Sequence, residues 1–267
     1  MPEKLGIIGG GVMGEALLSR LIASGIYQPG EVIVSDPSSE RREKLVDSYD
    51  IRVTDLNQQA FDATEAVMLA VKPQIFPAVV AALTHTPAPQ PLLVSIMAGV
   101  PLASLEAAFS GWPIVRAMPN TPATVGAGMT AIALGQQVTP AHQALAQQIF
   151  GSVGEVVDVA ESLMDAVTGL SGSGPAYVAV MIEALADGGV AAGLPRAIAL
   201  QLAIQTVKGT AELLQASQLH PAVLKDRVTS PGGTTIAGIA RLESLGLRTA
   251  LIEAVGAACQ RSRELGE

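Results

Sequence analysis

Short apolar runs alternate with helical patterns through the first 160 residues. Between the first two runs, Leu17, Leu18 and Leu21 share one helical face, and Gly25 suits the end of that helix. Such alternation predicts an α/β fold, in which a doubly wound, mostly parallel sheet carries helices on both faces. The runs that predict strands are 5–9, 32–35, 66–71, 92–97, 114–118, 129–134 and 155–159.

The chain changes character from about residue 162, where long stretches rich in Ala and Leu follow a helical spacing. The stretches 177–186 and 197–207 are apolar nearly all round, which a monomer of this size would leave uncovered. We therefore expect two domains, a sheet domain over residues 1–160 and an all-helical dimerisation domain over residues 161–267. A second subunit would cover the apolar helices, so we expect at least a homodimer.

The composition of the chain limits the classes of molecule that it can bind. It has 16 Lys and Arg against 24 Asp and Glu, a net charge of −8, which argues against a cationic face for nucleic acid or an anionic membrane. Hydrophobic residues make up 49% and charged residues only 15%, so extensive burial is expected and disorder is excluded. Cys259 is the one cysteine, which forbids an internal disulfide and fits a reducing compartment. We expect a cytoplasmic protein with a small-molecule partner.

A glycine pattern lies where the first predicted strand meets the first predicted helix. Gly9, Gly11 and Gly14 form Gly-x-Gly-x-x-Gly, the fingerprint of a dinucleotide-binding turn of the Rossmann type. The first glycine permits the tight turn, the second lets a pyrophosphate approach the backbone, and the third lets the helix pack on the strand. An ordinary glycine-rich turn is the alternative, but the flanking strand and amphipathic helix favour the dinucleotide site.

The residues after the second predicted strand include groups that favour NAD and groups that favour NADP as the cofactor. Asp36 stands 22 residues after Gly14, where an acid binds the ribose hydroxyls of NAD. Ser35, Arg41 and Arg42 lie in the same turn and offer a hydroxyl and two guanidinium groups to a 2′-phosphate. Our hypothesis is that NADPH is preferred and NADH tolerated, with Asp36 turned outward.

A second anion site is predicted in the helical domain. The segment Val228-Thr-Ser-Pro-Gly-Gly-Thr-Thr-Ile236 is a glycine-rich loop that opens a helix. The unpaired N–H groups of such a helix start suit a small carboxylate, and Ser230, Thr234 and Thr235 add hydroxyl groups. The alternative is a threonine-capped helix after a turn. The three histidines have no partners at the spacing of a metal site or a catalytic triad, so we expect no metal.

Six distinctive motifs are spread over nearly the whole chain. They are Ile8-Gly-Gly-Gly-Val-Met-Gly14, Ala70-Val-Lys-Pro73, Met118-Pro-Asn-Thr-Pro122, Gly172-Ser-Gly-Pro-Ala-Tyr177, Ala186-Asp-Gly-Gly189 and Leu224-Lys-Asp-Arg-Val-Thr-Ser-Pro-Gly-Gly-Thr-Thr235. With these motifs the chain closely resembles the pyrroline-5-carboxylate reductases over nearly its whole length, and the Ser-Pro-Gly-Gly-Thr-Thr block is the most specific of them.

The resemblance implies roles for individual residues. Asn120 would lie near the nicotinamide, and the hydroxyl of Thr235, the expected catalytic residue, would face the imine nitrogen of the substrate. The carboxylate of the substrate would bind to the block formed by Ser230, Gly232, Gly233, Thr234 and Thr235. Some members have Asn where Arg227 stands, so no role is carried over to Arg227. The dinucleotide would contact Ile8, Gly9, Gly10, Gly11, Val12, Met13, Gly14, Ser35, Asp36, Asn57, Ala70, Val71, Lys72 and Pro73.

The implied reaction is hydride transfer from NAD(P)H to the carbon of a cyclic C=N bond, which converts 1-pyrroline-5-carboxylate to L-proline. An imine nitrogen can arrive protonated or take a proton from solvent, so the lack of a placeable His or Lys acid is expected. Members of the family intertwine their helical domains into dimers, often assembled into rings of five dimers. A hydroxyacid dehydrogenase of the same two-domain plan and a non-catalytic dinucleotide sensor are the alternatives.

Overall fold

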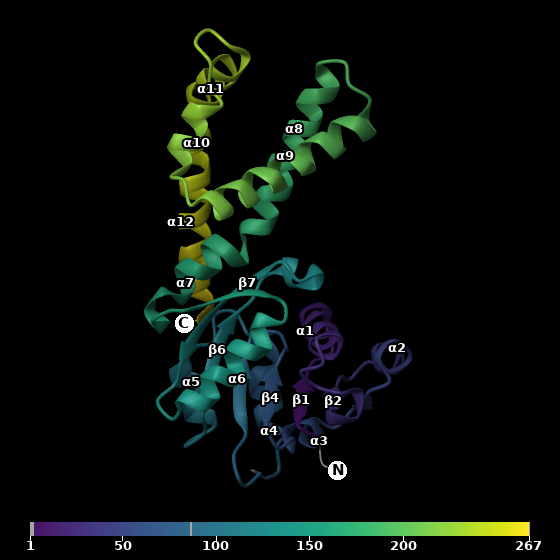
Figure 1. Cartoon of the computed structure of the whole chain (residues 1–267). Coiled ribbons are helices and arrows are strands. Elements are labelled where there is room, and N and C mark those ends of the chain that lie inside the picture. The colour runs from purple at the N-terminus through teal and green to yellow at the C-terminus, as the bar shows by residue number, and fades with distance from the viewer. Residues whose placement is uncertain (1–2, 86, 267) are drawn as a thin grey trace. The chain divides into compact units, whose positions relative to one another are not determined.

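The computed structural model describes residues 3–85 and 87–266 (Figure 1). The chain forms two compact units: one takes in the chain up to Ser173 together with the segment from Ala257 onward, and the other is Gly174–Gly256. The sequence predicts a division between residues 160 and 161, whereas the first unit continues to Ser173, 13 residues beyond residue 160. No helix in the described part of the chain combines the length and hydropathy needed to cross a bilayer.

An eight-stranded sheet forms the centre of the first unit, in the order β3-β2-β1-β4-β5-β6-β7-β8. All neighbouring strands are parallel except β6 and β7, so the predicted doubly wound, mostly parallel sheet is confirmed. The strands are β1 (Leu5–Ile8), β2 (Val32–Ser35), β3 (Arg52–Thr54), β4 (Ala66–Leu69), β5 (Leu92–Ser95), β6 (Ile114–Met118), β7 (Gly128–Leu134) and β8 (Gly154–Asp158).

Two hydrophobic layers cover the sheet because its central strands are apolar on both faces. Leu17, Leu21 and Phe150 belong to the cluster on one face, which α1, α2 and α6 cover; Phe61 and Leu105 belong to the other, which α3, α4 and α5 cover (Figure 1). These helices are α1 (Val12–Ala23), α2 (Ser39–Tyr49), α3 (Asn57–Phe61), α4 (Phe76–Ala81), α5 (Leu102–Ala108) and α6 (Pro140–Gly151). Short 3₁₀ turns are η1 (Pro29–Glu31), η2 (Pro73–Ile75), η3 (Thr121–Val125) and η4 (Glu161–Leu163).

The second unit is helical, as predicted. The chain reaches it through α7 (Met164–Val167) and one π-helical stretch, Thr168–Gly172. Helices α8 (Gly174–Ala191) and α9 (Arg196–Ser217) pack against each other through Ala186, Ala199 and Ala203. The remaining helices are α10 (Pro221–Arg227), α11 (Thr234–Ser244) and α12 (Leu247–Gly266).

The last turns of α12 belong to the first unit. There the Ser262 hydroxyl donates to Asp165 Oδ1 at 2.7 Å. Leu265 lies against Gly99, whose φ of +76° and lack of a side chain make room for it. The sheet-bearing unit is therefore completed by a segment from the far end of the chain.

Candidate active site

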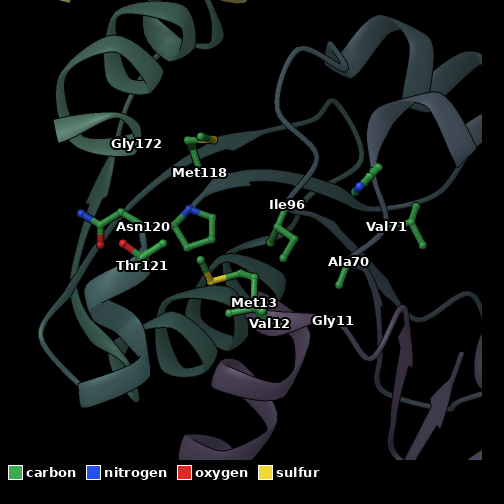
Figure 2. Close-up of a pocket in the computed structure, with 12 residues that line it drawn as sticks. Gly11, Val12, Met13, Ala70, Val71, Ile96, Met118, Asn120, Thr121 and Gly172 are labelled. Carbon is green, nitrogen blue, oxygen red and sulfur yellow. The ribbon is translucent and has the colours of Figure 1, made fainter. Parts of the chain in front are cut away.

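The order of the strands puts a crevice at the carboxyl ends of β1 and β4. The chain leaves β1 toward β2 and β3 on one side and then crosses to β4 on the other, and ligands bind at such switch points in open α/β sheets. A cavity of about 480 Å³ opens there, between the glycine turn after β1 and residues 70–72 after β4 (Figure 2). The lining residues are Gly11, Val12, Met13, Ala70, Val71, Lys72, Ile96, Met118, Pro119, Asn120, Thr121 and Gly172.

Two of the three glycines of the turn, Gly9 and Gly14, are required by their surroundings, and the third, Gly11, leaves open space beside the backbone. Gly9 has a φ of +105°, and a Cβ there would lie 2.6 Å from the Ala70 carbonyl oxygen. A Cβ on Gly14 would lie 2.3 Å from the Gly9 carbonyl oxygen, so the helix could not start so close to the strand. A Cβ on Gly11 would meet no protein atom within 4 Å, which leaves the backbone open to a ligand.

The start of α1 suits a phosphate group. Gly11 is the N-cap and no side chain caps the helix, so its first-turn N–H groups are open to an anion. The Val12 side chain is 70% exposed beside this turn, and Lys72 stands as a cation on the lining of the same cavity. These residues fit a dinucleotide, with its pyrophosphate on the helix start.

Asn120 lines the cavity but uses both ends of its amide for the protein backbone. Its Nδ2 donates to the Ser171 carbonyl at 3.0 Å, and its Oδ1 accepts from the Met129 N–H at 2.9 Å. The side chain is 9% exposed. Asn120 thereby connects β7 to the π-helical stretch that contains Gly172, another lining residue.

Not all of the predicted cofactor residues reach the cavity lining. Ile8 is buried at the end of β1, and its carbonyl accepts from the Ala70 N–H at 2.8 Å, so it holds the two loops together. Ser35 and Asn57 lie side by side, with a hydrogen bond of 2.9 Å from Ser35 Oγ to Asn57 Oδ1. Pro73 begins the turn η2 just beyond Lys72.

The expectation that Asp36 turns outward is wrong. Its Oδ2 accepts from the Gly10 N–H at 2.9 Å, and its Oδ1 accepts from the Ser38 N–H at 2.9 Å. The carboxylate therefore joins the end of β2 to the glycine turn, because both backbone donors point at it. Arg42 Nη1 donates to the Asp36 carbonyl at 2.7 Å, so this arginine supports the same turn.

Some lining residues were not predicted from the sequence. Ile96 follows β5, and Met118, Pro119 and Thr121 are the sequence neighbours of Asn120. Figure 2 shows Ile96, Met118 and Thr121 among the lining side chains. Met118, Pro119, Thr121 and Gly172 belong to motifs that carried the family resemblance, which was the available signal. Among the described residues, no group of three or more His, Cys, Asp or Glu is arranged to hold a metal ion.

In the helical unit, the predicted anion site forms the start of α11. Gly232 has a φ of +67°, the Gly233 N–H donates to the Ser230 carbonyl at 3.0 Å, and Gly233 is the N-cap of the helix. Thr234 and Thr235 are the first two residues of α11, and no side chain caps it. The threonine-capped alternative is therefore wrong, and the first-turn N–H groups have no capping hydroxyl.

Comparisons with known proteins agree with this geometry. Residues 161–265 match a family model described as pyrroline-5-carboxylate reductase dimerisation. Residues 4–99 match one described as NADP oxidoreductase, coenzyme F420-dependent. Pyrroline-5-carboxylate reductase from Synechocystis is 60% identical over 267 residues and covers 100% of both chains, and that of Escherichia coli is 42% identical over 268 residues with the same coverage.

Solved structures are similar over the same length. Pyrroline carboxylate reductase from Plasmodium falciparum, with NADP bound, has a TM-score of 0.89 at 33% identity and covers 99% of this chain and 98% of its own. The enzyme from Coxiella burnetii has a TM-score of 0.89 at 34% identity, with 100% of both chains covered. With the dinucleotide turn, the open start of α11 and these full-length relatives, the chain belongs to the pyrroline-5-carboxylate reductase family.

Proposed function

We propose that this chain reduces 1-pyrroline-5-carboxylate to L-proline in proline biosynthesis, with NADPH as the preferred donor and NADH as a second one. The observation that carries the proposal is the start of α11, where two glycines and two threonines leave a helix N-terminus without a side-chain cap. A hydroxyacid dehydrogenase would need an ionisable proton donor, and a dinucleotide sensor would need no second anion site. Neither alternative accounts for this segment.

Different residues bind the substrate carboxylate, orient the C=N bond and hold the dinucleotide. The backbone N–H groups of the block from Ser230 to Thr235 bind the substrate carboxylate at the positive end of α11. The Thr235 hydroxyl forms a hydrogen bond with the ring nitrogen and so fixes the plane of the C=N bond. The glycine turn, the first turn of α1 and Lys72 hold the dinucleotide phosphates, while Ser35, Asp36 and Asn57 form the adenosine end of the site.

When bound, the reduced nicotinamide supplies a hydride to the carbon of the C=N bond. The π electrons of that bond move onto nitrogen, which already carries a proton or takes one from solvent, so the product is a secondary amine. No protein acid is required because the nitrogen is basic. The contribution of the chain is therefore orientation and hydrogen bonding.

The assay that tests this function follows the absorbance of NADPH after addition of 1-pyrroline-5-carboxylate. We expect NADPH oxidation with stoichiometric formation of proline, and slower turnover with NADH. A 2-oxo acid serves as the control substrate and should produce no oxidation. Reduction of the oxo acid with none of the imine would contradict the proposed function.

The helical segment 161–267 is proposed to form a homodimer, and a ring of five dimers is a further proposal. Leu200 and Ile204 line an exposed groove of about 470 Å³ on α9, and a second copy of the chain would cover it.

The lone Cys259 fits a reducing environment, and we propose the cytoplasm as the location of the protein.

We expect sedimentation equilibrium at low micromolar concentration to give at least the dimer mass. Leu200→Glu should shift the protein toward the monomer, because it would bury a charge in the contact. Val46→Glu, at an exposed apolar position on α2, is the matched control and should leave the mass unchanged. A folded, active wild-type monomer would rule out the dimer.

A further inference from the structure

A carboxylate on α1 is paired with an arginine of the cofactor turn. Glu15 Oε2 lies 2.6 Å from Arg41 Nη2, and the side chains are 17% and 23% exposed. Lys44 Nζ lies 3.1 Å from Glu15 Oε1, and the Tyr49 hydroxyl donates to the same oxygen at 3.3 Å. Burial raises the pKa of the Glu15 carboxyl, but Lys44 and Arg41 outweigh it and hold that pKa below its usual value. Glu15 is therefore ionised at neutral pH.

The same arginine is fixed to the glycine turn by a second contact. Arg41 Nε donates to the Gly10 carbonyl, while the Gly10 N–H donates to Asp36. In folds of this type the adenosine ribose binds at the end of the second strand, and a nearby arginine accommodates a 2′-phosphate. Here the second strand, β2, ends at Ser35, and Arg41 lies near that end of the strand. Arg41 is also paired with an anionic side chain of the protein, that of Glu15.

We infer that Glu15 determines the preference between NADPH and NADH, because its carboxylate competes with the 2′-phosphate for the guanidinium group of Arg41. The inference rests on the proposed function for the identity of the cofactor. NADH has no 2′-phosphate, so its binding leaves the Glu15–Arg41 pair intact. Glu15 would thus determine specificity through Arg41, without itself touching the cofactor.

The direction of the effect follows from charge. A 2′-phosphate carries up to two negative charges, so a carboxylate bound to its partner arginine weakens the attraction and repels the ligand. Glu15→Gln removes that charge but keeps an oxygen that can accept from Arg41. The contact with the Gly10 carbonyl continues to hold the arginine beside the turn. Loss of Glu15 should therefore strengthen 2′-phosphate binding rather than disorder the site.

Calorimetric titration of the full-length protein with two adenosine fragments tests the inference without the imine substrate. We expect Glu15→Gln to tighten binding of adenosine 2′,5′-bisphosphate by about three- to tenfold at fixed low salt. The affinity for adenosine 5′-monophosphate should change by less than about twofold, since both ligands share every group except the 2′-phosphate. The KM for NADPH should fall in parallel, with the KM for NADH unchanged.

Two further variants separate the pair from general charge effects. Glu40→Gln removes one negative charge from the exposed first turn of α2, and we expect no change in the ratio of the two affinities. In an Arg41→Ala background, Glu15→Gln should lose most of its effect, which also distinguishes Arg41 from Lys44. An equal gain for both fragments, weaker bisphosphate binding, a full effect without Arg41, or no binding of either fragment would each overturn the inference. The fragment titrations contain no imine, so their results, unlike the KM values, are independent of whether 1-pyrroline-5-carboxylate is the substrate.

Discussion

Thr235→Val is expected to lower kcat/KM for 1-pyrroline-5-carboxylate by about ten- to one-hundredfold. A hydrogen bond to a charged group contributes about 1.5 to 3 kcal/mol, and valine removes it while keeping the size and the backbone N–H. Threonine and valine have similar helix propensities, so α11 should still form. Initial rates over a range of imine concentrations measure the effect, with the main loss expected in kcat.

Thr234→Val is the matched control, because Thr234 is the neighbouring residue in the first turn of the same helix. Its side chain is more exposed than that of Thr235, and its proposed contribution is through the backbone. We expect a clearly smaller loss. Wild-type kcat and KM in Thr235→Val would mean that Thr235 serves only the helix start and that the proposed catalytic residue is wrong.

Gly11→Ala is expected to weaken NADPH and NADH binding by tenfold or more and to leave the fold intact. The added methyl group meets no protein atom within 4 Å, and the backbone at Gly11, with φ −66° and ψ −173°, suits alanine. The methyl would instead occupy the space that a pyrophosphate needs to reach the first turn of α1. Fluorescence titration with either dinucleotide measures the affinity, and thermal unfolding checks the fold.

Gly30→Ala provides the control, because a Cβ at this exposed position in η1 also meets nothing within 4 Å. It should change neither the affinity nor the melting temperature. Unchanged binding in Gly11→Ala would place the pyrophosphate away from the glycine turn. A large drop in melting temperature would instead show that the turn is packed more tightly than its surroundings indicate.

The strands were predictable where burial on both faces produced continuous apolar runs. The predicted limits of 32–35 and 114–118 agree with those of β2 and β6. The edge strand β3 was missed because its three residues, Arg52–Thr54, include polar side chains and carry no period. The other edge strand, β8 (Gly154–Asp158), was predicted at 155–159, so β3 was missed because it is short and polar and not because it lies at an edge.

The candidate site was predictable to the extent that it depends on local sequence. The glycine turn and the start of α11 are continuous segments whose spacing has a direct physical meaning. The Glu15–Arg41 pair joins residues 26 positions apart on two helices, and Asn120 reaches Ser171 across 51 positions. Such contacts depend on how helices pack on the sheet, which the spacing of residues does not determine. The inward position of Asp36 was missed for the same reason, because its partner, Gly10, comes from another loop.

The return of α12 to the sheet-bearing unit affects the order in which the chain can fold during synthesis. Asp165 and Gly99 leave the ribosome long before Ser262 and Leu265, their partners in the last turns of α12. The helical unit Gly174–Gly256 must be translated in full before those partners exist. The sheet-bearing unit is therefore the first to begin folding but cannot be the first to finish. A nascent chain stalled anywhere before Ala257 lacks the segment of α12 that completes this unit.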